Sequence, residues 1–325
     1  MDDFIGVRGV ISPGRLKELS KRSDTKGLVQ LASHYGAIAA NTAALAVTWG
    51  SWWCVPFFIF QGILINQLYA AEHECDHSTA FKTRWLNVWA GQFSGFWILL
   101  PSPLHKWSHF THHRHTQDWD KDTELLDRKP FRSAWQYFWV FWGMPTHFFR
   151  AKSILQQAFG HVPEAVPTGR QRRQIVVGAR WHLVGYAAIA ASAVAFESLW
   201  PLVYWLGPIL CTKWFYWFQG LGEHTGLTHQ PNTLLNTRTL KTNAFMRWIN
   251  WNMTYHTVHH TYPSVPFHAL PRLHEEVTAI YPLPLPVEGY LECHWRILRE
   301  LLRGRTEHDI VADADARLTQ AEAAE

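Results

Sequence analysis

Long apolar segments recur along the chain in two close pairs. The first pair runs from about Tyr35 to Ala71 and divides at the sequence GSWWCVP, where Gly50 and Pro56 favour a turn. The second pair comprises His182–Phe196 and Leu199–Gly222. A helix needs about 20 apolar residues to cross a bilayer. The pattern therefore predicts four transmembrane helices in two hairpins, at about residues 35–52, 54–72, 181–197 and 199–221.

Two further segments are aromatic but too polar to span. Trp85–Leu100 contains Asn87 and Gln92, and residues 131–149 read FRSAWQYFWVFWGMPTHFF. Helices of this kind lie in the membrane interface with their apolar face in lipid. We therefore expect both segments to form membrane-surface helices in an all-α integral membrane protein.

The basic residues predict the orientation. Each hairpin returns the chain to the same face, and lysine and arginine concentrate there, in Arg15–Lys26, Lys82–Arg84, Arg170–Arg173 and Arg296–Arg305. The positive-inside rule makes that face cytoplasmic. The predicted organisation is a cytoplasmic N-terminal segment (1–34), a membrane domain (35–285), and a cytoplasmic C-terminal helix and tail (286–325). The acidic, alanine-rich residues 306–325 are expected to form a mobile tail.

Composition supports the membrane assignment. Charged residues make up 17% of the chain, against roughly 25% in soluble domains. The 19 tryptophans suit a membrane–water boundary. Four cysteines without a CxxC pair indicate reduced thiols and a cytoplasm-facing functional part. The N-terminus, MDDFIGVRGV, lacks the basic-then-apolar order of a secretory signal.

Three groups of histidines carry the candidate chemistry. They are His73-Glu-Cys-Asp-His77, His109-Phe-Thr-His112-His113 and His256-Thr-Val-His259-His260. On a helix, residues three and four apart share one face. Each group can therefore present two or three imidazoles toward one point.

Eight such imidazoles predict a site for more than one metal ion. Imidazole suits iron, copper, zinc and nickel, and eight donors exceed what one tetrahedral zinc can use. They match two metals with four or five ligands each. We expect the two helical hairpins to bring all three groups together in a histidine-rich cytoplasmic cap. Isolated histidines such as His161 are expected to be surface or core residues.

One alternative uses the first group alone. His73-Glu74-Cys75-Asp76-His77 also matches HExxH, the zinc metalloprotease motif, in which Glu74 is the general base. That reading leaves the two HxxHH groups without a role, so we place it behind the two-metal interpretation.

With these groups in place, the sequence resembles the membrane fatty-acid desaturase and hydroxylase superfamily, over roughly residues 35–285. The three boxes stand in that family's order around two helical pairs. The segment Trp251–Pro263 and the following Val-Pro-Phe-His268-Ala-Leu-Pro-Arg-Leu-His274 are similar to the bacterial desaturase type. The resemblance implies a protein of the bacterial inner membrane, with its active site and both termini in the cytoplasm.

The resemblance also implies a ninth ligand. Glu223-His224-Thr-Gly226-Leu227 is similar to a Glu-His-aromatic-Gly-Leu element of the related alkane hydroxylases, although Thr225 departs from it. We assign this ligand to His224, with His229 as the alternative. The expected metal ligands are His73, His77, His109, His112, His113, His224, His256, His259 and His260.

The family's cofactor is a non-haem pair of irons that uses O₂ to remove hydrogen from an unactivated C–H bond. Metal-bound histidines need an acceptor for their other ring nitrogen. The nearby candidates are Glu74, Asp76, Asp118, Asp120, Asp122 and Glu223. The two electrons per turnover imply an external donor, a ferredoxin, a rubredoxin or a b-type cytochrome with its reductase. Membrane lipid is the other expected partner, and no nucleic acid.

The boxes do not separate desaturation from hydroxylation. The flanks of the third box favour a desaturase acting on a fatty acyl chain or a related aliphatic substrate. A hydroxylase or mono-oxygenase acting on a lipid, an alkane or a small amino-acid-derived substrate is the alternative. A non-catalytic metal-storage protein is a third class, which would not need a substrate tunnel.

Overall fold

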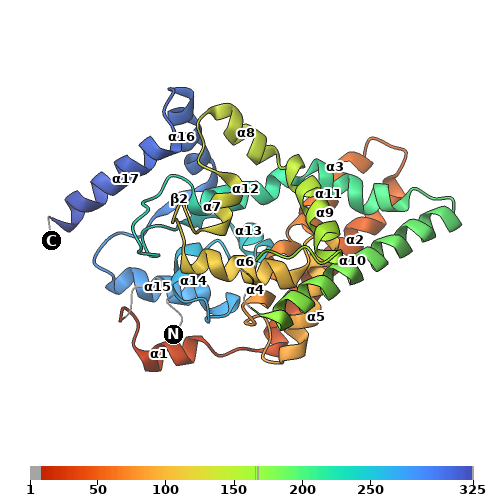
Figure 1. The fold of residues 1–325 in the computed structure, drawn as a ribbon, viewed down its shortest axis with the longest axis horizontal. Helices are drawn as coiled ribbons and strands as arrows, with labels where there is room; N and C mark the ends of the chain where they lie inside the picture. The colour runs from red at the N-terminus through yellow and green to blue at the C-terminus, as the bar shows by residue number, and fades with distance from the viewer. Residues whose placement is uncertain (1–8, 165, 167, 324–325) are drawn as a thin grey trace. The chain divides into compact units, whose positions relative to one another are not determined.

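The computed structural model describes residues 9–164, 166 and 168–323 (Figure 1). Residues 1–8 of the predicted N-terminal segment lie outside the described residues. The chain is mostly helical and divides into two compact units. The first unit comprises residues up to 22, 108–142 and 217–325, and the second comprises 23–107 and 143–216.

The second unit holds the apolar segments. Its helices are α2 (Asp24–Thr48), α3 (Cys54–Asn66), α4 (Leu68–Asp76), α5 (Arg84–Trp97), the start of α6 (Ser102–Arg114), α9 (Met144–Ala158), α10 (Gly169–Ala195), the π-helix η1 (Leu202–Leu206), α11 (Gly207–Cys211) and the start of α12 (Lys213–His224). In Figure 1, α9 lies along α10, and the two helices are in contact.

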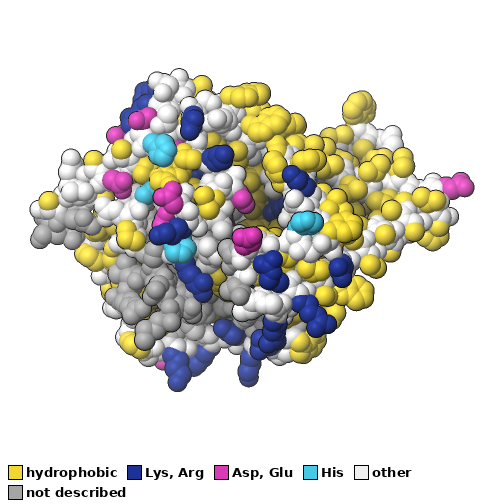
Figure 2. All heavy atoms as spheres, in the orientation of Figure 1, with side chains coloured by type: hydrophobic (Ala, Val, Ile, Leu, Met, Phe, Trp, Pro, Cys, Tyr) yellow, Lys and Arg dark blue, Asp and Glu magenta, His cyan; other side chains and the backbone are white. Residues whose placement is uncertain are grey.

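These helices bury polar residues and expose apolar ones. On α5, Asn87 and Ser94 are buried while Trp89 and Phe93 are exposed. On the face drawn in Figure 2, hydrophobic side chains gather where α3 and α10 lie. Water would penalise this arrangement, whereas lipid favours it, because small and polar residues then pack between helices.

Buried polar side chains link the helices of the second unit. Asn41 of α2 donates to Gln61 Oε1 of α3 at 2.8 Å, and Gln61 donates in turn to Thr42 Oγ1 at 2.8 Å. Asn66 donates to the carbonyl of Ile209 at 2.9 Å. Each bond satisfies a group that would otherwise be buried without a partner. The polar residues inside the predicted spans therefore hold α2, α3 and α11 together.

Two helices among the described residues are long and apolar enough to cross a membrane. They are Cys54–Asp76, which joins α3 to α4 through Gln67, and Gly169–Ala195. Only 22% of the most apolar part of Gly169–Ala195 is buried, so its apolar side chains face outward. The second helix begins well before the predicted residue 181, because Thr168 caps it by accepting from the backbone N–H of Gln171.

The other two predicted spans do not meet these criteria of length and hydropathy among the described residues. The helix α2 extends the 35–52 prediction back to Asp24, where Ser23 forms the N-cap. Residues 199–221 are divided among η1, α11 and the first part of α12. Pro208 has no backbone N–H and cannot complete a regular ladder of α-helical hydrogen bonds, and the π-helix η1 directly precedes α11, which contains it.

The first unit combines short helices with a small sheet. Its elements are α1 (Pro13–Leu19), the end of α6, α7 (Thr123–Arg128), α8 (Ala134–Trp142), the end of α12, β1 (Thr239–Lys241), α13 (Ala244–Ile249), α14 (His256–Thr261), the 3₁₀-helix η2 (Phe267–Ala269), α15 (Leu270–Ile280), β2 (Val287–Gly289), α16 (Tyr290–Leu302) and α17 (Glu307–Glu322). The strands pair in parallel, with Thr239 opposite Val287. The predicted surface segment 131–149 forms α8 and the start of α9, and α8 exposes Trp135, Phe138, Trp139 and Trp142.

The expectation of a mobile C-terminal tail was wrong. Residues 307–322 form α17, and Ile310 joins a hydrophobic cluster with Ile297 and Leu301 of α16. Glu307 is buried and accepts two hydrogen bonds of 2.7 Å from the Arg128 guanidinium and one of 2.9 Å from the backbone N–H of Phe131. Composition suggested a tail because Glu307 and Ile310 are two anchoring residues in a segment that otherwise consists largely of alanines and acidic residues.

We expect Glu307→Ala to lower the thermal stability of the protein. The substitution leaves the Arg128 guanidinium buried without its carboxylate, which costs about 3–5 kcal/mol. The melting temperature in detergent measures the effect. Asp313→Ala is the matched control, because Asp313 forms an exposed pair with Arg305 worth at most about 1 kcal/mol. Equal losses in the two variants would contradict the anchoring role.

Candidate metal centre

Two histidine triplets of the first unit are carried by helices α6 and α14. His109, His112 and His113 lie in the last turns of α6, and α14 begins at His256 and includes His259 and His260. All six side chains are buried. The spacing of three and four residues places each triplet on one helical face, as predicted.

Four histidines converge in the first group. His112, His224, His256 and His260 each offer a ring nitrogen within 4.8 Å of the others, and we call them the four-histidine group. Nε2 of His224 lies 2.8 Å from Nε2 of His256. His224 is the last residue of α12, so three helices supply the group.

The ring orientations in this group fit metal ligation. His112 Nδ1 donates to Asp122 Oδ1 at 2.8 Å, and Nε2 of the same ring is buried without a hydrogen-bond partner. Thr116 Oγ1 donates to the carbonyl of His112 and accepts from His260 Nδ1 at 3.1 Å. Nε2 of His260 is likewise buried without a hydrogen-bond partner. A metal-binding histidine has this arrangement, in which one nitrogen is fixed by the protein and the other is left for the ion.

The carboxyl group of Glu223 supports a third ring. Its Oε1 lies 3.3 Å from His256 Nδ1, and Gln219 donates to the same carboxyl group. Burial raises the pKa of Glu223 to about 8. A metal ion bound to the adjacent histidines would favour the carboxylate, because a cation stabilises nearby negative charge.

Burial and neighbouring carboxylates set the protonation of the group. Burial lowers the pKa of His224 and His260 well below the usual value, which keeps their rings neutral and able to bind a cation. Burial also acts on His112, but Asp122 and Glu124 outweigh it and raise its pKa to about 9. Asp122 is buried as well, yet the His112 ring holds the pKa of that carboxyl below its usual value.

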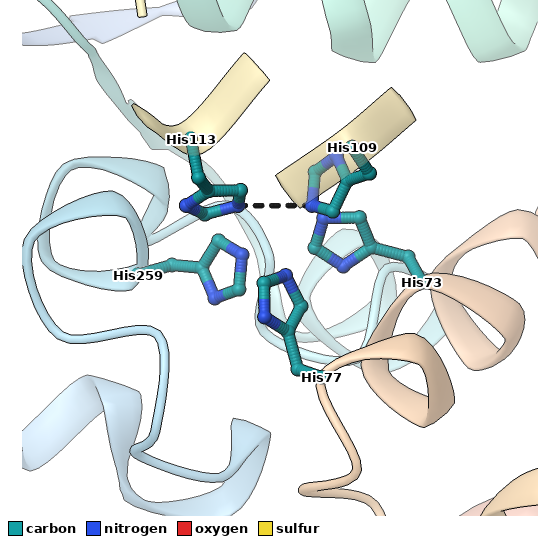
Figure 3. Close-up of side chains that lie close together, drawn as sticks. All are labelled: His73, His77, His109, His113 and His259. Atoms are coloured by element: carbon teal, nitrogen blue, oxygen red, sulfur yellow. Dashed lines mark hydrogen bonds between the residues drawn. The ribbon is translucent and has the colours of Figure 1, made fainter. Parts of the chain in front are cut away.

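A second group collects the remaining histidines of the two triplets. His109, His113 and His259 offer ring nitrogens within 4.8 Å of one another, and we call them the three-histidine group. Nε2 of His113 lies 2.9 Å from Nε2 of His109, the dashed line in Figure 3. Burial lowers the pKa of His259 to about 3, so this ring too is neutral.

The histidines of the first box belong to the second unit. His73 lies in the last turn of α4 and His77 caps its C-terminus (Figure 3). Their ring centroids are 5.1 Å apart, which confirms that the two side chains share one face. Both side chains are buried.

One histidine near this box was not predicted. Nδ1 of His105, on α6, lies 3.0 Å from Glu72 Oε1 and 3.0 Å from Asp76 Oδ2. Burial opposes protonation of this ring, but the two carboxylates outweigh it and raise the pKa of His105 to about 10. The available signal was its position four residues before His109 on the same helix.

The predicted carboxylates divide into two classes. Asp122 and Glu223 contact candidate ligands, as described above. Asp76 instead binds Ser102 and His105, while Asp118 pairs with Lys121 at 3.5 Å and Asp120 is exposed. Glu74 is buried on α4. Glu124, not singled out from the sequence, lies 3.8 Å from His109 Nδ1 and from His112 Nε2.

The two candidates for the ninth ligand have different surroundings. His224 belongs to the four-histidine group. His229 lies against the indole ring of Trp119, with 4.2 Å between ring centroids.

Comparison with known proteins identifies the family. The sequence profile of the fatty acid desaturases matches residues 50–289 of this chain. The protein belongs to the fatty acid desaturase family. This membership confirms the resemblance drawn from the three histidine boxes, and it does not favour the metalloprotease alternative.

Several relatives with named activities are similar to the chain. It is 25% identical over 254 residues to an sn-1 oleoyl-lipid 12-desaturase of Anabaena variabilis, a match that covers 71% of this chain and 57% of the relative. It is 36% identical over 104 residues to an sn-1 acyl-lipid omega-3 desaturase (ferredoxin) of Synechocystis sp., covering 30% and 28%. A Delta(9) fatty acid conjugase-like enzyme of Dimorphotheca sinuata is 23% identical over 292 residues, covering 79% and 76%. The chain thus spans little more than half the length of the Anabaena desaturase.

Proposed function

We propose that this protein is an O₂-dependent membrane desaturase that introduces a double bond into a fatty acyl chain. The observation that carries the proposal is the four-histidine group, in which Nε2 of His112 and of His260 face inward with the opposite ring nitrogens held by Asp122 and Thr116. The named activities of the relatives favour an acyl-lipid substrate.

Nine histidines would hold two iron ions. The four-histidine group would bind one ion. The three-histidine group would bind the other, together with His73 and His77 from α4. When bound, the irons would supply the oxidising power, drawn from O₂ and two electrons, that removes two hydrogens from adjacent carbons. His224 is the ninth ligand in this assignment, since His229 is not part of either group.

The protein itself would contribute the orientation of the ligand rings and the exclusion of water from the site. Asp122, Thr116 and Glu223 fix the orientation of three ligand rings, as the distances above describe. All nine imidazoles are buried, so bulk water is kept from the centre. A dry site of fixed geometry suits a reaction in which a reactive oxidant must meet one C–H bond.

We propose the membrane arrangement that the sequence predicts. Four spans in two hairpins, with surface helices, would place the histidine-rich cap and both termini in the cytoplasm and the protein in a bacterial inner membrane. The outward apolar faces of α5, α8 and α10 support contact with lipid. The name of the Synechocystis relative favours ferredoxin as the electron donor over rubredoxin or a b-type cytochrome.

The test combines metal and product analysis of the full chain. Expression in a bacterium without its own desaturases, together with a ferredoxin and its reductase, should yield new unsaturated acyl chains by gas chromatography–mass spectrometry. The purified protein should carry about two irons per chain. Hydroxylated chains in place of alkenes would overturn the desaturase assignment. One zinc per chain, lost only when His73 or His77 is replaced, would overturn the two-iron centre.

Asp122→Asn should weaken metal binding without unfolding the protein. The amide can still accept from His112 Nδ1 but lacks the charge that raises the basicity of the ring, so we expect about a 10- to 100-fold loss of iron affinity. Competition with a chelator, followed by iron analysis, measures it. Asp118→Asn removes the charge that pairs with Lys121, while its amide oxygen can still accept from the backbone N–H of Asp120, so it should retain the wild-type affinity. Similar losses in both variants would show that Asp122 has no special role.

A further inference from the structure

A lysine in the second unit is buried without a counter-ion among the described residues. Lys213, the first residue of α12, has 0% of its surface exposed, and its Nζ has no hydrogen-bond partner in that part of the chain. The Nζ atom lies 3.5 Å from the centroid of the Tyr216 ring. A buried basic group without a partner destabilises a protein. The positive end of the α12 dipole adds to this cost.

A second cation shares the same aromatic ring. The guanidinium of Arg150, on α9, lies 5.4 Å from the Tyr216 centroid and donates to the carbonyl of Ile98 at 2.9 Å. In the part of the chain that the structure describes, no carboxylate pairs with Arg150 or Lys213. Two basic side chains therefore lie beside one tyrosine ring, and among the described residues neither is paired with a carboxylate.

Two neighbouring side chains also have buried polar atoms without a hydrogen-bond partner among the described residues. His147 Nε2 and Asn66 Nδ2 both bind the carbonyl of Ile209, at 3.1 and 2.9 Å. The opposite atoms of these side chains, Nδ1 and Oδ1, are buried without hydrogen bonds. Ile209 stands four residues before Lys213, so this region of apolar helices holds several unsatisfied polar groups. Ionisable residues within membrane helices mark substrate or ion sites.

Ring contacts connect the cations to a proposed iron ligand. The Tyr216 ring meets Tyr69 edge-on, with centroids 4.7 Å apart, and Tyr69 lies 5.7 Å from the ring of His73. Tyr69, Tyr216 and Arg150 are partly exposed. The Tyr216 and Tyr69 rings therefore form an apolar surface between the basic side chains of Lys213 and Arg150 and the proposed metal ligand His73 of α4.

We propose that Lys213 and Arg150 bind the anionic group of the aliphatic substrate, a carboxylate or a phosphate, and thereby fix which carbons reach the irons. The assignment of the ligand as substrate rests on the proposed desaturase function. The anionic group supplies the counter-charge that both basic side chains lack. The aliphatic part of the substrate then lies along the Tyr216 and Tyr69 rings toward His73. Charge-assisted hydrogen bonds of this kind are stronger than those between neutral groups.

The test measures binding without turnover. The full-length protein in phosphatidylcholine nanodiscs, without reductant, is titrated with dodecanoate, its methyl ester and dodecyl phosphate. We expect at least one anion to bind about 10- to 100-fold more tightly than the ester. A preference for dodecanoate identifies a free fatty acid, and a preference for dodecyl phosphate identifies a phospholipid headgroup. Equal affinities for all three ligands would overturn the proposal.

Substitutions of Lys213 and Arg150 test whether these two side chains cause the preference for an anion over the ester. Lys213→Met and Arg150→Met should abolish the preference for the anion, whereas Lys213→Arg should keep most of it. Arg173→Met, at an exposed position of α10, is the matched control and should bind as the wild type does. Retention of the preference in Lys213→Met would overturn the role of Lys213.

A stability measurement separates ligand binding from a structural role. Without ligand, Lys213→Met should raise the melting temperature by several degrees, because it removes a buried polar group that has no hydrogen-bond partner among the described residues. A lower melting temperature would assign Lys213 to the fold and overturn the proposal. Because no turnover is needed, an anion preference in a protein that forms no alkene would support this site and reject the desaturase.

Discussion

His112→Ala should abolish desaturation and release iron from the protein. The substitution removes one Nε2 donor from the four-histidine group and leaves the Asp122 carboxylate buried without the ring that it holds. His259→Ala should have the same effect through the three-histidine group, because both ions are needed for the proposed two-electron chemistry. Elemental analysis and acyl-chain analysis of the same preparations measure both losses.

The control for these variants is His161→Ala. His161 is exposed and lies outside both groups, so iron content and activity should stay near wild-type values. Gel filtration in detergent shows whether the His112 and His259 variants remain folded. Full iron and activity in folded His112→Ala protein would contradict the site.

Gly62→Ala should prevent the second unit from packing correctly. A Cβ atom at this position of α3 would lie 2.1 Å from the carbonyl oxygen of Pro208 and 2.4 Å from Thr212 Oγ1. Backbone atoms cannot yield without displacing α11, so the loss of stability should reach about 3 kcal/mol or more. The melting temperature and the yield of monodisperse protein measure the effect.

Gly36→Ala is the matched control for this prediction. Gly36 is also helical, on α2, but an added Cβ would meet nothing within 4 Å. Alanine at an open helical position stabilises by about 0.5–1 kcal/mol relative to glycine. The two substitutions should therefore change the melting temperature in opposite directions. A stable Gly62→Ala protein would show that α3 and α11 do not need this close approach.

The sequence alone determined the features that depend on local spacing. The three and four residue intervals within His109–His113 and His256–His260 put each triplet on one side of its helix, since both segments are helical. The runs of apolar residues likewise located the helices Cys54–Asp76 and Gly169–Ala195. The same boxes and their flanks predicted the family, which the family profile confirms.

Sequence spacing could not sort the histidines into groups. His112 lies beside His113 in sequence, yet the two rings join different groups. Adjacent residues of a helix point about 100° apart, so they can serve two centres. Which group each ring joins depends on the partners that α12 and α14 bring to it.

Tertiary structure also decided among similar candidates. From the sequence, Asp118, Asp120 and Asp122 were equally good candidates to accept a hydrogen bond from a ligand ring. Only Asp122 contacts His112, because its position at the N-cap of α7 directs its side chain inward. His224 rather than His229 joins the histidine group, and Ile310 and Glu307 convert a predicted tail into α17. These outcomes follow from contacts between residues far apart in the chain, whereas periodicity reports only which side of its own helix a residue occupies.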